Sequence, residues 1–316
     1  MFQWPTADFY KFKKKKIRFS PKKVKEIENF FAKNYKTRFA VLFPSARSSI
    51  NIILKYNKFD RSMIVNLPLW SSTCLYETIG SITNISVKNY NSECIIAVHK
   101  WGNTFNLKKL KRKQLVIDDS ADTLPGKNYV PFESNSNYEI LSLPKIIGSY
   151  SGGIILIKDK GFYNYCKSLQ NKNIKLAAEQ SEEKYKYNFD KGEYSNWSGK
   201  ENFNISLDFN TVENIHGCLK NFNININIIK ERQKIIKKKF KNIIFETKRL
   251  GPCVIFQDKK FKNFDQKLEK KHYNFSKKLF RETYEKCAIF PIHFKITSRQ
   301  FNKKLNQILK INKKNC

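Results

Sequence analysis

The sequence has no long apolar run and few histidines. No stretch approaches the roughly 18 consecutive apolar residues that a membrane-spanning helix needs, so we expect no membrane span. The first five residues lack a basic flank followed by an apolar stretch, and no secretion signal is expected. Only four histidines occur. His216 and Cys218 are close enough in sequence to share a metal, but we interpret that spacing as coincidence and expect no metal site.

Paired cysteines are also missing. The seven cysteines are scattered, their number is odd, and no two have a C-x-x-C spacing. In a chain of 316 residues this pattern argues against a disulfide framework. Reduced thiols are typical of proteins in a reducing compartment. We therefore expect a cytoplasmic protein.

Acidic residues are scarce: 27 Asp and Glu stand against 61 Lys and Arg, which gives a net charge of +34. One interpretation is a polyanionic partner, with Lys13–Lys16 and residues 236–241 as the best candidate surface. The other is compositional drift, because Lys, Asn, Ile, Phe and Tyr are abundant together. Lysine is spread along the chain and outnumbers arginine, the preferred residue for reading phosphate or guanine. We favour drift and do not expect nucleic-acid binding.

Short apolar segments bounded by turn signals alternate with helical segments in the first half of the chain. This alternation predicts an α/β fold with a mostly parallel sheet, in which ligands bind beyond the carboxyl ends of the strands. The expected strands are Ala40–Phe43, Met63–Leu67, Ile82–Val87, Cys94–Val98, Leu115–Ile117, Ile140–Leu143 and Gly153–Ile157, and the expected helices are 24–36, Ser48–Tyr56 and 72–79.

The pattern of short apolar segments stops after Gly161, and we divide the chain accordingly. Residues 1–23 are predicted as an N-terminal arm, 24–185 as a large domain, and 186–316 as a loop, a connecting helix and a small C-terminal α/β domain. Within these parts the expected elements are a helix over 162–185, a loop over 186–210, one helix over 211–245, strands at 252–257 and 287–296, and a basic helix over 298–313.

Two strand ends carry candidate binding residues. Ser45, Ala46 and Arg47 open a helix, whose free N–H groups and dipole suit a phosphate, although serine is also simply a good helix cap. Asp119 and Asp122 follow a buried strand. A carboxylate there could hold a cation or a protonated ring nitrogen, or could only cap a turn.

A third strand end carries Lys145, which follows Leu141–Pro144 and precedes the pair Gly152–Gly153. The amine of a lysine near a phosphate cradle and a carboxylate can act as a nucleophile toward a carbonyl cofactor. One lysine among so many indicates nothing by itself. The order and spacing of the three strand ends are the informative feature.

Six segments carry a resemblance to a known family. They are Glu26–Ala32, Pro44–Ile50, Val98–Asn103, Val116–Ala121, Ser142–Ile155 and Glu231–Phe240. In order, they resemble the entry helix, the phosphate turn, the V-H-x-x-G segment, the I-E-D-A-A segment, the lysine block and the E-R-R helix of the DegT/StrS aminotransferases. These are sugar aminotransferases of the fold type I superfamily, which depends on pyridoxal 5'-phosphate (PLP).

The resemblance implies a homodimer and a set of PLP contacts. Lys145 would bind the cofactor covalently and then act as a general base, and Asp119 would keep the ring nitrogen protonated. The other contacts that it implies are Ser45, Ala46, Arg47 and Ser142 at the phosphate, Trp70 stacked on the ring, and Asp122 near the ring hydroxyl, where the family has glutamine or histidine.

The function that follows is amino transfer from an amino acid to a nucleotide-linked keto sugar, for surface polysaccharide biosynthesis. Two alternatives share the fold: a lyase or decarboxylase with the same cofactor, and a non-catalytic relative kept as a binding protein. Asp122 and shortened loops, including the one between Ile85 and Cys94, motivate the last. Binding of a polyanion through the basic surface is a fourth possibility.

Overall fold

The computed structural model describes most of the chain between Ser20 and Lys314. The described ranges are 20–88, 91–104, 107, 114–126, 129–149, 151–172, 207, 209–240, 244–245, 247–257, 269–273 and 285–314. Several predictions fall outside these ranges. They are the N-terminal arm up to residue 19 with its Lys13–Lys16 run, residues 173–185 of the predicted helix, and nearly all of the predicted 186–210 loop.

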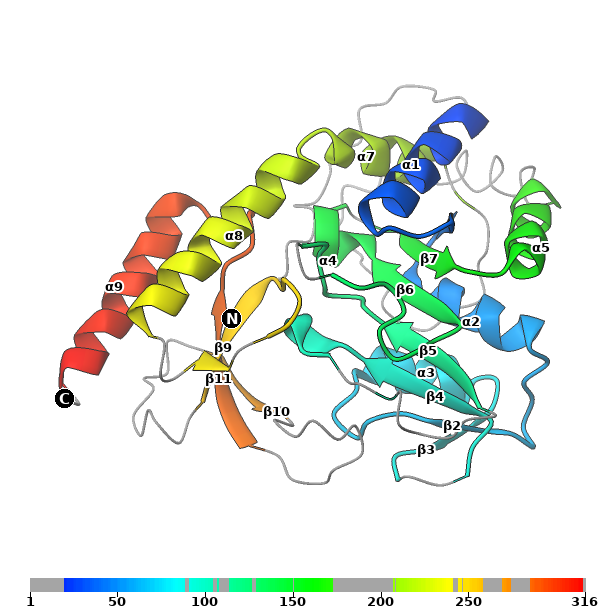
Figure 1. The fold of residues 1–316 in the computed structure, drawn as a ribbon, viewed down its shortest axis with the longest axis horizontal. Helices are drawn as coiled ribbons and strands as arrows, with labels where there is room; N and C mark the ends of the chain where they lie inside the picture. Colours follow the sequence, from blue (N-terminus) through cyan, green and yellow to red (C-terminus); the bar gives the residue numbers. More distant parts are fainter. Residues whose placement is uncertain are drawn as a thin grey trace, which may run out of the picture.

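The first half forms a seven-stranded sheet (Figure 1). Its strands are β1 (Phe39–Phe43), β2 (Ile64–Asn66), β3 (Asn84–Ser86), β4 (Cys94–Val98), β5 (Leu115–Asp119), β6 (Tyr138–Ser142) and β7 (Gly153–Ile157). The order is β1-β7-β6-β5-β4-β2-β3, and only β7 runs antiparallel to its neighbours. All seven predicted strands are present, and the mostly parallel sheet is confirmed.

Helices cover both faces of this sheet. They are α1 (Pro21–Asn34), α2 (Ala46–Tyr56), α3 (Thr73–Gly80), α4 (Leu143–Ile147) and α5 (Lys160–Lys172), with a short 3₁₀ turn, η1 (Lys100–Gly102). Side chains of α1 and α4 share one hydrophobic cluster with one face of the strands, and those of α2, α3 and α5 share a second cluster with the other face. Ser20 caps α1, where its Oγ accepts a hydrogen bond from the Lys23 amide, and Pro21 opens the helix.

A smaller antiparallel sheet follows, with the strand order β10-β11-β9-β8. Its strands are β8 (Ile244–Phe245), β9 (Cys253–Gln257), β10 (Glu269–Tyr273) and β11 (Glu285–Pro291). The helices of this half are α7 (Phe209–Leu219), α8 (Phe222–Lys239) and α9 (Ser298–Lys314). In Figure 1, α8 and α9 lie beside each other along this sheet. None of the helices described in either half is long and apolar enough to cross a membrane.

The prediction of one helix over 211–245 is wrong. The chain turns at Lys220–Asn221, where two long i→i−3 hydrogen bonds to Gly217 and Cys218 replace helical ones. The turn starts a new helix at Phe222, which is buried with its ring 4.9 Å from that of Phe30. Packing against α1 therefore overrides the helical period. The last residues of the range form β8 instead.

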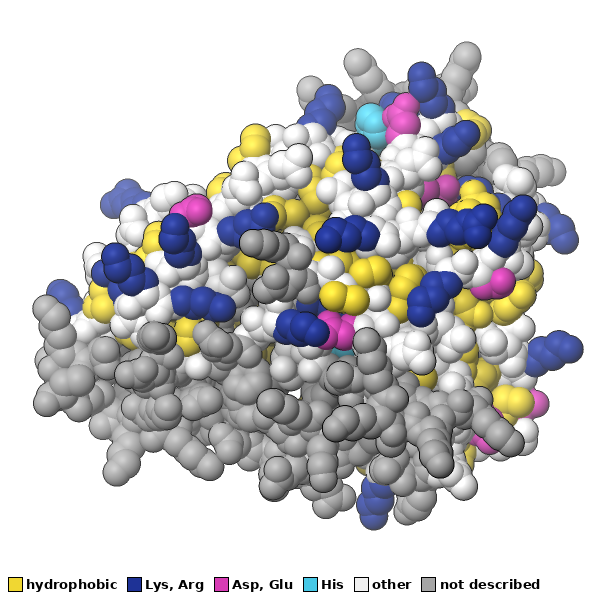
Figure 2. Space-filling model, viewed as in Figure 1, with side chains coloured by type: hydrophobic (Ala, Val, Ile, Leu, Met, Phe, Trp, Pro, Cys, Tyr) yellow, Lys and Arg dark blue, Asp and Glu magenta, His cyan; other side chains and the backbone are white. Residues whose placement is uncertain are grey.

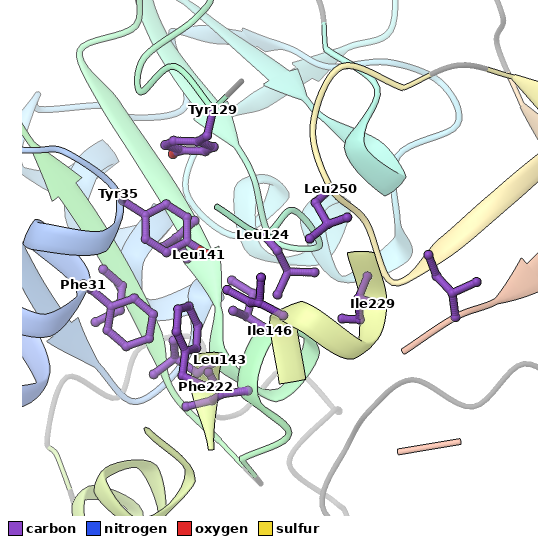
Figure 3. Packing of buried hydrophobic residues seen from close by; sticks show 14 of the residues in the cluster. Phe31, Tyr35, Leu124, Tyr129, Leu141, Leu143, Ile146, Phe222, Ile229 and Leu250 are labelled. Atoms are coloured by element: carbon purple, nitrogen blue, oxygen red, sulfur yellow. The ribbon is translucent and has the colours of Figure 1, made fainter. Parts of the chain in front are cut away.

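One hydrophobic cluster connects the two halves (Figure 3). It contains Phe31 of α1, Leu141 of β6 and Phe222 of α8, all buried. It continues through Leu124 and Leu250, which belong to the first and second halves and whose backbones form an isolated β-bridge. The two sheets therefore share apolar packing, and the second half supports the first.

Candidate active site

The predicted residues gather at one edge of the seven-stranded sheet. Ser45, Trp70, Asp119 and Ser142 follow or end β1, β2, β5 and β6, which are parallel to one another. Gly153 begins the antiparallel β7 at the same edge, paired with Phe43 on one side and Ser142 on the other. This is the carboxyl edge, where ligands of parallel sheets bind.

The phosphate turn is built by close backbone packing. Ser45 caps α2, and its Oγ accepts a hydrogen bond of 3.1 Å from the Ser48 amide. The Pro44 carbonyl accepts one of 2.8 Å from the Gly152 amide. A Cβ on Gly153 would lie 2.3 Å from the Ser45 carbonyl carbon and 2.4 Å from the Ala46 nitrogen. Only glycine allows this approach, which holds the opening of α2 in place.

Lys145 lies in the first turn of α4, so its placement at a strand end is corrected. The strand stops at Ser142 because Pro144 suits the start of a helix and not a ladder. The Leu143 amide donates to the Gly152 carbonyl at 3.0 Å, which connects α4 to the segment that also touches the phosphate turn. Lys145 is half-buried.

Asp119 ends β5 and is buried. Its Oδ1 accepts a hydrogen bond of 3.0 Å from the Ala121 amide. Burial raises the pKa of the Asp119 carboxyl to about 6, and the charge of Asp122 adds to the increase, while the positive charge of Lys145 works against it. Asp119 and Lys145 are therefore in electrostatic contact, as the sequence predicts for a lysine and an acid at one cofactor.

Asp118 points to the opposite face of the sheet, because successive side chains of a strand alternate. Its Oδ1 lies 3.1 Å from His99 Nε2, and both side chains are fully buried. Burial alone would raise the pKa of Asp118, but the charge and hydrogen bond of His99, helped by Arg249, lower it. The charged partners of this acid, His99 and Arg249, are therefore themselves buried in the protein.

Asp122 and Trp70 complete the edge. Asp122 is buried, and its Oδ1 accepts a hydrogen bond of 3.0 Å from the Trp101 amide. Lys100 extends over both indoles, with its Nζ 4.9 Å from the Trp101 ring centre and 5.7 Å from that of Trp70. Trp70 is half-buried. A flat aromatic ring is thus present close to the loop that carries Asp122.

Two buried charged residues next to this edge, Glu139 and Arg249, were missed by sequence reasoning. Glu139 of β6 is fully buried and accepts hydrogen bonds from Tyr129 and from Arg249, both at 2.7 Å. A glutamate between apolar residues of a strand signals a buried charge, but nothing in the sequence tells which of the many basic residues balances it. Arg232, in the E-R-R segment, instead donates to the carbonyl groups of His293 and Ile296.

The residues at this edge fit PLP. They offer the amine of a half-buried lysine, a buried carboxylate within reach of its charge, an aromatic ring, and a helix opening held close by a glycine. In the described part of the chain no group of three or more Asp, Glu, His or Cys side chains could hold a metal, and His216 pairs with Glu26 at 3.0 Å. The fold and the site define a PLP-binding protein of fold type I.

A family model described as "Putative PLP-dependent aminotransferase" matches residues 27–312. The chain belongs to this family, which confirms the resemblance found in the sequence. No curated protein sequence matches this chain.

Solved structures show the same fold at low sequence identity. The protein described as "Putative sugar aminotransferase Spr1654 from Streptococcus pneumoniae, PMP-form" has a TM-score of 0.60 and 13% identity, covering 94% of this chain and 92% of its own. A DegT DnrJ EryC1 StrS aminotransferase from Brucella abortus has a TM-score of 0.59 and 11% identity, covering 91% and 89%. DesI, solved with its TDP-sugar product, has a TM-score of 0.57 and 14% identity over 76% of this chain. The chain spans 65% of the length of DesI.

Proposed function

We propose that this protein transfers an amino group from an amino acid to a keto sugar linked to a nucleotide. The observation that carries the proposal is that Lys145, which is half-buried, lies close enough for its charge to act on the buried Asp119 carboxyl, at the edge that also holds the Ser45 turn. Membership in a family of PLP-dependent aminotransferases supports amino transfer. The sugar rests on the similar fold of DesI, whose structure contains a TDP-sugar product.

Lys145 would hold PLP covalently and, once displaced by the amino donor, would carry a proton at its Nζ to and from the donor's Cα. Its place in the short helix α4, fixed to Gly152 through the Leu143 amide, keeps that nitrogen at the sheet edge. PLP, when bound, supplies an electron sink for the bond that breaks at the donor. The lysine is thus both anchor and proton carrier.

Asp119 would hold the proton on the ring nitrogen. Its pKa of about 6 shows that burial penalises its charge, and Lys145 only partly offsets that penalty. A protonated ring nitrogen beside the carboxyl would provide a second positive partner and keep Asp119 ionised at neutral pH. The bound cofactor would thus offset the free-energy cost of burying the charged Asp119 carboxyl.

The remaining contacts follow from the positions of the side chains. Ser45, Ala46 and Arg47 open α2, and Ser142 precedes α4, so these four would bind the phosphate with hydroxyl, guanidinium and helix-opening N–H groups. Trp70 would stack on the ring. Asp122, whose Oδ1 accepts the hydrogen bond from the Trp101 amide, would lie near the ring hydroxyl.

The proposal includes a cytoplasmic homodimer in surface polysaccharide synthesis, with no nucleic-acid partner. In Figure 2, lysines and arginines are dispersed over the visible face between apolar and neutral side chains. Among the described side chains of that face they form no single basic block. This dispersion supports compositional drift over a dedicated polyanion-binding surface.

The test is a half-reaction followed by a full one. Purified protein loaded with PLP and mixed with glutamate should convert its absorbance to that of the aminated cofactor and release a keto acid. Nucleotide-linked keto sugars should then be aminated. Lys145→Ala should lower the rate by about a hundredfold or more, the scale of a lost general base, and Lys160→Ala, an exposed lysine on α5, should not. Release of carbon dioxide would instead identify a decarboxylase, and no turnover with any donor would identify a binding protein.

A further inference from the structure

A strap from the second half of the chain, residues 248–251, lies between the two loops that carry the site. On one side, the Arg249 amide donates to the Gly102 carbonyl at 2.9 Å, in the loop after β4. On the other, the Leu124 amide donates to the Leu250 carbonyl at 2.8 Å, just beyond the loop after β5. Figure 3 shows the side chains of Leu124 and Leu250 close together. The strap therefore joins both loops.

Two glycines make this fit possible. Gly102 has a φ of +88°, and a Cβ on it would lie 2.3 Å from the Arg249 carbonyl oxygen. A Cβ on Gly251 would lie 2.5 Å from the Trp101 carbonyl oxygen. The backbone of the strap and the backbone of the loop after β4 are therefore in direct contact at both glycines. The Trp101 amide in turn donates to Asp122, so contact with the strap reaches a predicted site residue.

The side chain of Arg249 holds the strap in place through hydrogen bonds to buried groups of the first half. Its guanidinium is fully buried and donates to Ser120 Oγ, Glu139 Oε1 and the Val130 carbonyl, each at 2.7 Å. It also lies over the Tyr129 ring, 4.5 Å from its centre. Burial alone would lower the pKa of Arg249, but Glu139 raises it, so the arginine stays charged.

The bond to Ser120 matters most, because Ser120 directly follows Asp119. Ser120 Oγ also donates to Glu139, so one hydroxyl is held by two charged groups. A buried ion pair adds little stability compared with apolar residues of the same volume. Its geometry, however, is restrictive: an arginine fork fixes its partners in direction as well as distance.

We propose that Arg249 is a positioning residue that holds the loops of Asp119 and Asp122 in the arrangement that receives the cofactor. It acts through Ser120 on the first loop and, through the strap, on Gly102 and Trp101. The inference rests on the proposed role of Asp119 at the cofactor. It means that the second half of the chain helps to build the site in the first half.

The test compares two buried arginines. Arg249→Met removes the anchor, and Arg232→Met removes an arginine whose bonds hold α8 to the 292–296 turn. In the cofactor-free protein, amide hydrogen exchange at 101–103 and 119–124 should accelerate by about tenfold or more in Arg249→Met, but not in Arg232→Met. PLP affinity should fall about 10- to 100-fold, as when outer-shell partners of a metal site are removed.

Two milder variants cover the case in which Arg249→Met fails to fold. Ser120→Ala removes only the bonds to the Asp119 loop, and we expect severalfold weaker PLP binding with an unfolding midpoint lowered much less than in Arg249→Met. Arg249→Lys keeps the charge but loses the fork, and we expect an intermediate affinity. The proposal is overturned if exchange accelerates evenly over the whole chain, or if Ser120→Ala and Arg249→Lys bind PLP as wild type does. Should wild type itself bind no PLP, the proposed function fails, and exchange at the two loops still decides the positioning role.

Discussion

Asp118 and Asp119 are neighbours in the chain and opposites in the structure. Both end β5, and both are buried. Asp118 faces His99 and Arg249, and its pKa is lowered. Asp119 feels the charge of Lys145, but burial raises its pKa to about 6. One acid has its partners within the protein, and the other keeps a charge that the protein does not fully balance.

The different surroundings of these two acids separate a structural role from a binding role within one motif. An acid with internal partners stabilises the fold, whereas an acid left short of partners costs stability and can bind a cation supplied from outside. By this criterion we propose Asp119, and not Asp118, as the functional carboxylate. Three predictions test the contrast, in order of expected size.

Asp118→Asn should destabilise the protein by about 3 to 5 kcal/mol at neutral pH, because it removes one partner of a buried pair. A lowered pKa contributes stability above the ordinary value of 3.8 and loses it as pH falls through the folded value. The difference from wild type should therefore shrink in acid. Urea unfolding at neutral and acid pH measures it. Asp60→Asn, at an exposed carboxylate, serves as control, and an equal loss in both variants would contradict the account.

Asp119→Asn should have the opposite sign in the cofactor-free protein. Since the folded pKa is about 6 against an ordinary value of 3.8, folding becomes less favourable as pH rises between these values. The cost at neutral pH is about 3 kcal/mol, and the amide should recover up to that amount. Unfolding curves at pH 4 and pH 7 check this. PLP binding should weaken in the same variant. A variant that is less stable than wild type at pH 7 would show that Asp119 is a structural acid.

Ser45→Ala should have the smallest effect on stability. It removes a helix cap and should cost about 1 kcal/mol, as should Ser20→Ala at the start of α1. The two serines differ in place, since only Ser45 lies at the sheet edge. PLP affinity should therefore fall in Ser45→Ala alone. Equal PLP affinity in the two variants, measured by titration, would remove Ser45 from the phosphate site.

The fold could be predicted from the sequence because its signals are local. β4 and β7 match the expected bounds residue for residue, since strands that are buried along their whole length read as short apolar, β-branched runs. The predictions that failed concern elements that depend on tertiary contacts. The break between α7 and α8 depends on the packing of Phe222 against α1, and β8 and β10 are a short strand and a polar strand, with no apolar period to reveal them. The predicted division into two domains stays a prediction.

The candidate site could be predicted only for residues inside motifs. Ser45, Asp119 and Lys145 lie at strand and helix ends that the sequence marks. Arg249 and Glu139 are 110 positions apart, and their pairing depends on how the second half folds back on the first. Asp118 belongs to a predicted motif, but only the alternation of β5 shows that it faces away from the site.

The central claim is that Lys145 is the lysine that binds PLP. Reduction of the PLP-loaded protein with borohydride, followed by digestion and mass spectrometry, locates the bond directly. The account predicts one labelled peptide, with the cofactor on Lys145, and its loss in Lys145→Ala. A label on another lysine, or one scattered over many surface lysines and unchanged in Lys145→Ala, would contradict it.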